Sequence, residues 1–443
     1  MSFNNDKMLN MLLSFIGTLL VLMPAAHAWN YKHVGSVPVE KAAFSSLHRV
    51  GSTDKFDLSV STFKSAVKYD VVYVFRDVGG QLLSGGSWNP GNNLQKEVLV
   101  DGLLWPNEVE PVPANAFEGD EKEYWWVANG FLVPGKEQGS IGLIEAYEAG
   151  QDGRCPYHNL TDNGQGEKWW YHRVYFVDAD GDNKLDMLTA RADTSGRGVL
   201  AEMVYFKQPS SKPLTSTPWD VTVLFDGPDA LFRYEKMSVN SATRHAIFSC
   251  QYFAEKLVVS WSDSNPPDFK NMNHRVIEDI VDNRYFDAEI VDLNGDGRED
   301  LLVSINSMTN GQLVAFEMPD NWATGTWTRH LIAEGFKPHG PIVTEGMGSP
   351  GTTFTFKPDA STFTNKPQIM LTGDDDSNIY VFESMDDSDP ANWEYSKTAI
   401  FTTATGKGTV GAPSVGDVTG DGLVEVFVPE YSGDLLHVLK YES

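Results

Sequence analysis

Oxygen-bearing side chains recur in this chain at a spacing that suits a hard cation. In the segment 292–300, glycines occupy loop positions four and six, and oxygen donors occupy positions one, three, five and nine: Asp292, Asn294, Asp296 and Asp300. A short loop of this kind wraps a cation with several converging oxygens, and the main-chain carbonyl of Arg298 would fill position seven. Because hard oxygen ligands favour calcium over zinc or copper, the segment predicts a calcium site.

The same loop occurs at two other places in the chain. The segment 178–186 repeats the full donor set with Asp178, Asp180, Asp182, the carbonyl of Lys184, and Asp186. The segment 417–425 is a weaker copy with Asp417, Thr419, Asp421, the carbonyl of Leu423, and Glu425. A metal-free turn is the alternative, because Asp, Asn and Gly also favour tight turns. We expect structural calcium ions that neutralise the clustered carboxylates and fasten each loop.

The spacing of the loops predicts a repeated architecture. They begin at residues 178, 292 and 417, so neighbouring loops are separated by roughly twice 60 residues. Each interval has room for one degenerate unit. The loop at 238–245 has lost its carboxylates, and the segment 356–359 leads into an insertion before the next apolar run. Two earlier units are expected to have loops near 118–121 and 62–65. The chain is therefore expected to contain seven units.

Each unit is expected to form four short strands. In the fifth unit, apolar segments rich in Val, Ile and aromatic residues occur at 286–291, 300–305, 312–318 and 327–333, separated by Gly, Asn and Asp turns. This composition indicates strands, and no window shows a sustained helical period. Seven units of four strands predict an all-β, seven-bladed β-propeller.

The two ends of the chain are expected to complete one blade together. The fourth strand of a unit carries a recurring tag, seen at 219–224, 327–332 and 393–395, with a variant at 272–277. The last unit ends after its third strand, at 434–440, and the segment 29–35 carries a Trp-x-x-x-His version of the tag. We therefore expect the N-terminal strand to close the ring, which removes exposed sheet edges. The tag histidines, His274 and His330, are expected to be structural.

The pattern Asp-x-Asn-Gly-Asp-Gly-x-x-Asp-Leu at 292–301 resembles the FG-GAP/VCBS repeat family, which includes the propeller of integrin alpha chains. The resemblance extends to the other two loops and thins out in the remaining four units. It implies a calcium-bearing propeller with one cation loop between the first two strands of each well-formed blade. Such propellers serve adhesion, lectin and lyase roles, so the resemblance implies no single activity.

Composition and the N-terminus predict a secreted protein. The apolar run 8–23 is followed by Ala26-His27-Ala28, so residues 1–28 are expected to be a signal peptide and residues 29–443 a single mature propeller. An uncleaved anchor is the alternative, but the run is short for a bilayer span, and no later stretch could cross a membrane. The net charge of −27 argues against nucleic acid as a partner. We expect an extracellular monomer.

Two covalent features depend on this location. A secreted chain permits a disulfide, but the repeat register places Cys155 and Cys250 two units apart and favours unpaired thiols. The sequon Asn159-Leu160-Thr161 predicts a glycosylated, exposed loop.

A ligand-binding face is expected opposite the cation loops, where connections between consecutive blades gather around the axis. These connections are rich in Trp, Tyr, His and Arg, at 105–108, 168–173, 233–234, 284–285 and 337–339. Aromatic rings stack on sugar faces, and guanidinium groups pair with carboxylate or sulfate, so an acidic glycan would suit this face. The alternative is that the aromatics plug the channel and wedge between blades, while Arg satisfies buried carbonyls.

Two functions remain open from the sequence. The first is a binding module for an extracellular glycan or protein at the inter-blade loop face. The second is a polysaccharide lyase, in which Tyr171 or His172 would remove a proton beside a uronate carboxylate. The cation that neutralises that carboxylate would come from Arg173, Arg233 or Arg284, and His339 belongs to the same set of candidates. The sequence contains no nucleophile elbow, zinc signature or phosphate loop.

Overall fold

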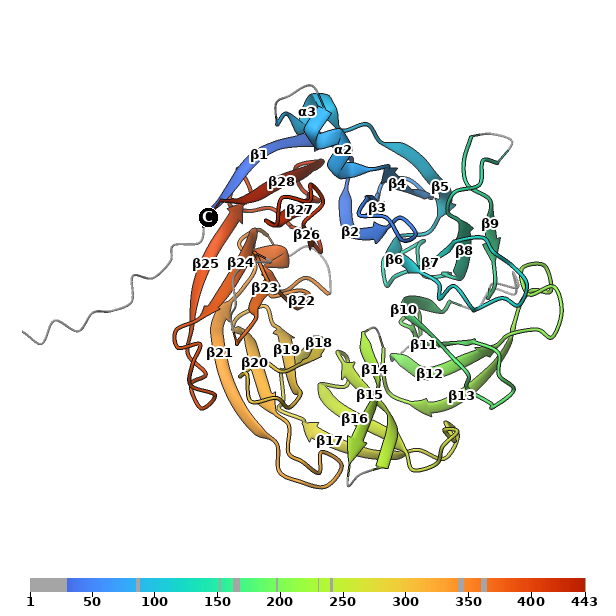
Figure 1. Cartoon of the computed structure of the whole chain (residues 1–443). Helices are drawn as coiled ribbons and strands as arrows, with labels where there is room; N and C mark the ends of the chain where they lie inside the picture. The colour runs from blue at the N-terminus through green and yellow to red at the C-terminus, as the bar shows by residue number, and fades with distance from the viewer. Residues whose placement is uncertain are drawn as a thin grey trace, which may run out of the picture.

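Seven four-stranded antiparallel sheets surround a central axis in the computed structural model (Figure 1). The structure describes residues 30–84, 88–150, 153–161, 168–196, 198–229, 231–239, 242–341, 346–359 and 365–442. The expected seven-bladed β-propeller is confirmed, and within each of the first six blades the strands follow chain order.

The strands of the first four blades, in chain order, are these: β2 (Ala42–Arg49), β3 (Phe56–Thr62), β4 (Asp70–Phe75), β5 (Glu97–Leu103); β6 (Pro106–Pro111), β7 (Tyr124–Asn129), β8 (Ile141–Glu145), β9 (Tyr157–Asn159); β10 (Trp170–Val177), β11 (Asp186–Asp193), β12 (Leu200–Lys207), β13 (Asp220–Asp226); β14 (Phe232–Val239), β15 (Ala242–Gln251), β16 (Lys256–Ser262), β17 (Asn273–Glu278). Blades 5 to 7 comprise β18 (Arg284–Val291), β19 (Asp300–Asn306), β20 (Gly311–Glu317), β21 (Thr328–Phe336); β22 (Thr353–Phe356), β23 (Gln368–Thr372), β24 (Asn378–Ser384), β25 (Tyr395–Thr402); and β26 (Ser414–Gly416), β27 (Glu425–Glu430), β28 (Leu435–Glu442) with β1 (Asn30–Pro38).

The N-terminal strand closes the ring as predicted. β1 lies antiparallel to β28, with Tyr31 opposite Tyr441 and Ser36 opposite His437. Figure 1 shows the blue start of the chain beside its red end in the seventh blade. Trp29, the first residue of the expected tag, lies outside the described residues.

Apolar contact between neighbouring blades holds the ring together. The buried residues form seven clusters, and each cluster joins two adjacent blades; one contains Phe248 of β15 with Val303 of β19. Strands in the middle of a blade are covered on both faces, and every residue of β19 is buried. This double burial explains why the segment 300–306 reads as an almost continuous apolar run.

Two expectations are corrected: the position of the first two strands of blade 1, and the absence of helices. The segment near 62–65 was expected to join the first two strands, but residues 63–69 join β3 to β4, because the polar-looking segment 42–49 forms the inner strand β2. Two short helices, α2 (Val78–Leu83) and α3 (Pro90–Asn93), connect β4 to β5, and the 3-10 turn η2 (Asp374–Asp376) follows β23. These elements are too short to produce a helical period in the sequence.

The structure also bears on the cysteines, the sequon and the N-terminal segment. Cys155 and Cys250 are both free, as expected. Asn159 is the last residue of β9 and is half-buried, so the sequon begins in a strand rather than in the exposed loop that was predicted. Residues 1–28 lie outside the described residues, and none of the described helices is both long and apolar enough to cross a membrane.

Candidate functional site

The three predicted cation loops occupy the same topological position. They join β10 to β11, β18 to β19 and β26 to β27, which is the first hairpin of blades 3, 5 and 7. In the fifth blade, Asp292 accepts main-chain hydrogen bonds from Gly295, Asp296 and Gly297 at 2.8–3.1 Å. Asp178 and Asp417 accept equivalent bonds within their own loops. In all three blades, the carboxylate at position one therefore stabilises the loop conformation by accepting main-chain hydrogen bonds.

The acid at position nine is buried in each loop. Asp186, Asp300 and Glu425 are at most 1% exposed, and each accepts a hydrogen bond from the second residue of its loop. Burial raises the pKa of Asp186 to about 6 and the pKa of Asp300 and of Glu425 to about 7. A bound cation would stabilise the ionised form of these groups, so the donor chemistry fits calcium.

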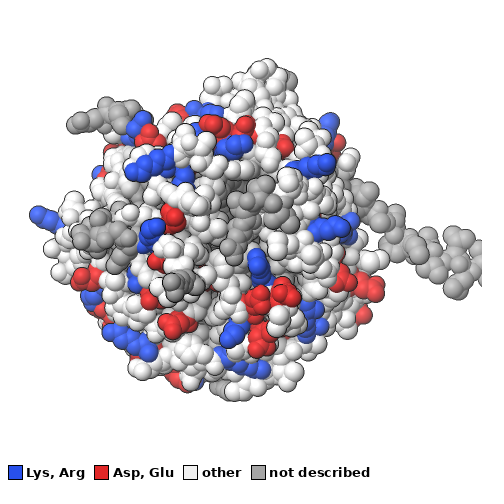
Figure 2. Space-filling view, turned by 180° about the vertical axis from the view of Figure 1, so that it is seen from behind, with Lys and Arg blue, Asp and Glu red and all other residues white. Residues whose placement is uncertain are grey.

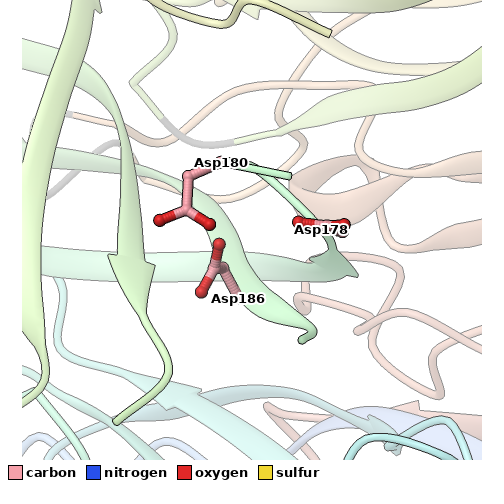
Figure 3. Close-up of side chains that lie close together, drawn as sticks. All are labelled: Asp178, Asp180 and Asp186. Carbon is pink, nitrogen blue, oxygen red and sulfur yellow. The ribbon is translucent and has the colours of Figure 1, made fainter. Parts of the chain in front are cut away.

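The loop of blade 3 brings three carboxylates together. One carboxylate oxygen from each of Asp178, Asp180 and Asp186 lies within 4.8 Å of the other two. Figure 3 shows the Asp180 and Asp186 carboxylates turned toward one another, with Asp178 beside them on the loop. Three anionic oxygens this close suit a divalent cation with oxygen coordination.

The third strand distinguishes the loops from one another. Lys440 lies opposite the position-nine acid Glu425 in blade 7. Lys207 in blade 3 and Glu317 in blade 5 come directly after Phe206 and Phe316, which lie opposite the residues that follow position nine. The Lys207 ammonium contacts Asp180 and lies 3.0 Å from Asp182. The Lys440 ammonium contacts Asp421 and lies 3.9 Å from Glu425. Two loops therefore carry an internal counter-cation from the third strand.

The loop of blade 5 has an acid at this position instead. Glu317 adds a carboxylate, and the cation present is the Arg298 guanidinium, 2.7 Å from Asp296 and 3.4 Å from Glu317. Arg298 is the residue whose main-chain carbonyl is expected to bind calcium, and its side chain is 45% exposed. Asn294 at position three is buried. Loop 292–300 thus combines the full donor set with the fewest competing ammonium groups.

The predicted arginines lie in the central channel rather than in connecting loops. Arg173 is in β10, and its guanidinium is bonded to Glu108 of β6 and lies 3.1 Å from Asp287 of β18. Arg233 of β14 lies 3.5 Å from the same Asp287 and donates to the carbonyl of Ala288. Both arginines are therefore occupied by partners from other blades. The expectation of loop positions was wrong because the inner strands begin earlier than their apolar runs.

Two further carboxylates line this channel. Burial, followed by the charge of Glu108, raises the pKa of Glu110 to about 7. Burial also raises the pKa of Glu289 to about 7, although the main-chain N–H of Thr355 donates to this carboxylate at 2.5 Å. The channel therefore holds a network of two arginines and four acids, contributed by strands β6, β10, β14 and β18.

Four side chains at the inter-blade loop face form a compact group, which we call the Phe131 cluster. Its members are Trp105, Phe131, Trp170 and His172. The Phe131 ring lies 6.3 Å from Trp105, 5.4 Å from Trp170 and 5.3 Å from His172, measured between ring centroids. Trp105 joins β5 to β6, Phe131 follows β7, and the other two belong to β10. Blades 2 and 3 therefore build the cluster together.

The polar atoms of the Phe131 cluster lack partners. The indole Nε1 atoms of Trp105 and Trp170 and both ring nitrogens of His172 are buried without a hydrogen bond among the described residues. The three side chains belong to residues that are 7%, 1% and 5% exposed. Burial lowers the pKa of His172 to about 3, so this imidazole is neutral at physiological pH. Buried polar groups normally find partners, so these atoms indicate a missing acceptor.

The backbone at Trp105 is held in an unusual conformation. Its φ is 54°, in the left-handed region that bulky residues rarely adopt. The Asp70 carboxylate accepts the Trp105 main-chain N–H at 3.0 Å and is itself paired with the buried Lys136 ammonium at 2.5 Å. Lys136 also lies over the Trp105 ring, at 5.7 Å from its centroid. The surrounding structure therefore fixes the indole where it meets Phe131.

The other predicted residues do not join this cluster. Tyr171 packs in the apolar core between blades 2 and 3. Arg284 donates to the hydroxyl of Tyr252 at 3.2 Å and lies over its ring. His339 is exposed, and its main-chain N–H donates to the carbonyl of Asp375. The expected single group of Tyr, His and Arg is therefore divided between the core, the channel and the rim.

Sequence reasoning overlooked several residues at the inter-blade loop face. Phe131 and Tyr252 follow the second strands of their blades, β7 and β15. The predicted ligand residues came only from connections between blades. Asp374 begins the run Asp374-Asp375-Asp376, and burial followed by its two neighbours raises its pKa well above the ordinary range. Three consecutive acids directly after an apolar strand were a signal that the sequence did offer.

Two cavities lie on the opposite face, next to the cation loops. One of about 650 Å³ is lined by Met237, Arg298 and Trp322, and one of about 860 Å³ is lined by Phe117 and Lys184, among others. Figure 2 shows the molecule from the side hidden in Figure 1, with Lys and Arg side chains interspersed among Asp and Glu. Lys184 and Arg298 thus face cavities at the same loops where their carbonyls are expected to bind calcium.

Comparison with known proteins identifies no family for this chain. No protein-family profile matches the sequence, and no curated protein matches it. The chain is similar to a solved structure described as the Dos1 propeller, with a TM-score of 0.45 and 10% identity over 93% of this chain and 94% of that chain. It is also similar to the NanB sialidase from Streptococcus pneumoniae, with a TM-score of 0.38 and 10% identity over 93% of this chain and 70% of that chain. These likenesses concern the fold alone, and the FG-GAP/VCBS resemblance rests on the three loops.

Proposed function

We propose that this protein is a calcium-stabilised, extracellular β-propeller that binds a glycan at its inter-blade loop face. The observation that carries the proposal is the Phe131 cluster, where two indole N–H groups and an imidazole are buried and have no hydrogen-bond partner in the described part of the chain. An unsatisfied buried polar group costs about 1–3 kcal/mol, so a ligand that supplies acceptors after these side chains turn toward it would recover part of that cost.

A sugar has the chemistry that this cluster lacks. Its hydroxyl and carboxylate oxygens accept hydrogen bonds from indole and imidazole, and its C–H face packs on an aromatic ring. Phe131 supplies an aromatic face that is partly exposed, while Trp105 and Trp170 supply donors on either side.

Calcium and secretion form the second part of the proposal. The repeated loops fold around their own carboxylates, and the buried acid at position nine is expensive to ionise without a cation nearby. Extracellular calcium would meet that need, and the expected signal peptide would deliver the protein there. Calcium would bind through Asp178, Asp180 and Asp186 in blade 3 and through the corresponding residues of blades 5 and 7, and would supply rigidity rather than chemistry.

A glycan panel tests the proposed function. Full-length protein in calcium buffer is screened against immobilised neutral and acidic oligosaccharides, and each hit is confirmed by titration. Saturable binding of at least one glycan is the expected result. Absence of binding across the panel, by protein whose calcium content and fold are verified, would overturn the glycan proposal.

The same panel separates binding from catalysis. Asp374 has a raised pKa and lies near the Tyr252–Arg284 pair, so acid–base chemistry on an acidic glycan is the alternative. A lyase would generate an unsaturated uronate, which is detected by its ultraviolet absorbance. Binding without new absorbance supports a lectin-like module, and new absorbance that is lost in Asp374→Asn supports the enzyme.

A further inference from the structure

Two imidazole nitrogens and one hydroxyl oxygen, all possible metal ligands, lie close together where the N-terminal strand closes the ring. The Nε2 atom of His33 lies 3.1 Å from the Nδ1 atom of His437, and the Ser36 hydroxyl lies 2.8 Å from that Nδ1 and 3.1 Å from the His33 Nε2. The atoms therefore form a nearly equilateral triangle across β1 and β28. Two imidazole nitrogens on a zinc ion at about 2.0–2.1 Å would be separated by roughly 3.3 Å, so the observed geometry is close to that of a metal site.

A carboxylate orients one of these imidazoles. The Nε2 atom of His437 lies 2.7 Å from the Glu430 carboxylate on β27, and both residues are buried. A carboxylate at Nε2 favours the tautomer that has its proton there, which leaves a lone pair on Nδ1. Metal-binding histidines usually have such a partner on the nitrogen that does not bind the ion. The Phe401 ring packs against His437 at 4.5 Å and shields this side of the ring.

The equivalent histidines in other blades have simpler partners. His274 of blade 4 lies 2.9 Å from the Ser260 hydroxyl, and His330 of blade 5 lies 3.4 Å from the Glu317 carboxylate and stacks on Trp393. Among these fourth-strand histidines, only His33 faces a second imidazole. The blade that is closed by two distant chain segments is thus also the one that has a pair of imidazole ligands.

We propose that His33 and His437 bind a divalent transition-metal ion, such as Zn²⁺, that links β1 to β28. The Ser36 hydroxyl or a water molecule would complete the coordination with further water, because His33 is exposed and the site is open to solvent. Imidazole ligands suit zinc, copper and nickel better than calcium, so this site is distinct from the carboxylate loops. The ion would fasten the strand that completes the ring, at a position that no carboxylate loop reaches.

Metal titration tests this site. Full-length protein is first saturated with calcium to fill the carboxylate loops, and then titrated with Zn²⁺ and with Co²⁺ as a spectroscopic probe. We expect one ion per chain, Co²⁺ absorption bands typical of imidazole coordination, and a higher melting temperature with Zn²⁺. The His33→Ala variant should lose all three effects, and Glu430→Gln should weaken the affinity by about 10–100-fold.

The matched control is His274→Ala, which removes the same tag residue at a position where it faces the Ser260 hydroxyl instead of a second imidazole. It should bind Zn²⁺ as the unmodified protein does. His33→Gln, which keeps a hydrogen-bonding group beside Ser36, serves as a second variant if His33→Ala folds poorly. Equal zinc affinity in the His33 variants and the unmodified protein, or Co²⁺ spectra without imidazole coordination, would overturn the proposal.

Discussion

Arg173 and Asp287 are separated by 114 residues in the sequence, yet their side chains meet at 3.1 Å in the central channel. Both are buried, and Glu108 of the second blade bonds to the same guanidinium. Three blades are therefore connected through one cation. Because Arg173 binds both acids and Arg233 also lies 3.5 Å from Asp287, these side chains form a network rather than separate pairs.

Replacing Arg173 by Met should destabilise the fold strongly. Glu108 would lose its guanidinium partner, and buried Asp287 would keep only the Arg233 contact at 3.5 Å. Removal of one member of a buried ion pair costs about 3–5 kcal/mol. The measurement is the free energy of unfolding from denaturant titration. Arg49→Met is the control, because the Arg49–Asp54 pair is 57% and 94% exposed. That variant should change stability by no more than about 1 kcal/mol, and equal effects of the two variants would contradict the network.

Glu110 should make stability depend on pH. Its folded-state pKa is raised to about 7, so folding favours the protonated acid, and this contribution is lost as pH rises from about 4.3 to about 7. Glu110→Gln stays neutral, so we expect it to be more stable than the unmodified protein at pH 8 by about 1–3 kcal/mol, with little difference near pH 4. Unfolding across pH tests this, with the exposed Glu121→Gln as control. A constant difference at all pH values would contradict it.

The spacing of the cation loops was sufficient to predict the seven blades. Each loop marks the first hairpin of a blade, and the missing loops at 238–245 and 356–359 were found by interpolation. The first blade was harder, because β2 contains Ser and His in place of the usual apolar residues. Local pattern thus predicts architecture well, and it fails where an inner strand faces the channel rather than a neighbouring blade.

The contents of the site could be predicted only in part. Trp105 lies in the connection between blades 1 and 2 where it was expected, whereas His172 was expected in a connection and lies in β10. Their neighbour Phe131 lies between β7 and β8, within one blade and outside the connections between blades. Side-chain partners such as Glu108 and Arg173 come from different blades, and no sequence period encodes which residues meet across a closed ring.

Removal of calcium should lower the melting temperature. A chelator would leave the buried acids at position nine without a counter-ion, and the unfolding midpoint is measured before and after verified calcium removal. Asp296→Asn should remove the tightest site, since loop 292–300 lacks an ammonium from its third strand. An unchanged melt after complete calcium removal would contradict the structural role.

Lys207 should reduce the calcium affinity of the loop in blade 3. Its ammonium lies among Asp180 and Asp182, so a divalent ion must displace it. We expect Lys207→Met to tighten calcium binding at this loop by about three- to tenfold, as measured by calorimetric titration. Lys256→Met, an exposed lysine in β16, is the control and should leave all sites unchanged. Weaker binding in Lys207→Met would contradict the displacement.

The most direct test of the account compares two tryptophan-to-phenylalanine substitutions. Trp170→Phe removes from the Phe131 cluster an indole N–H that has no partner among the residues the structure describes. Trp219→Phe removes an indole N–H that donates to the Pro213 carbonyl at 2.8 Å. Both residues are buried, so the substitutions are matched in burial and in volume. The readouts are glycan affinity, by titration with the best ligand of the panel, and the free energy of unfolding.

We predict that Trp170→Phe weakens glycan binding at least about tenfold and leaves stability unchanged or slightly higher, because it removes a buried donor that the free protein leaves unsatisfied. Trp219→Phe should lose about 1 kcal/mol of stability and bind glycan normally. Unchanged glycan affinity in Trp170→Phe, together with a loss of stability, would show that this indole is structural and would contradict the account.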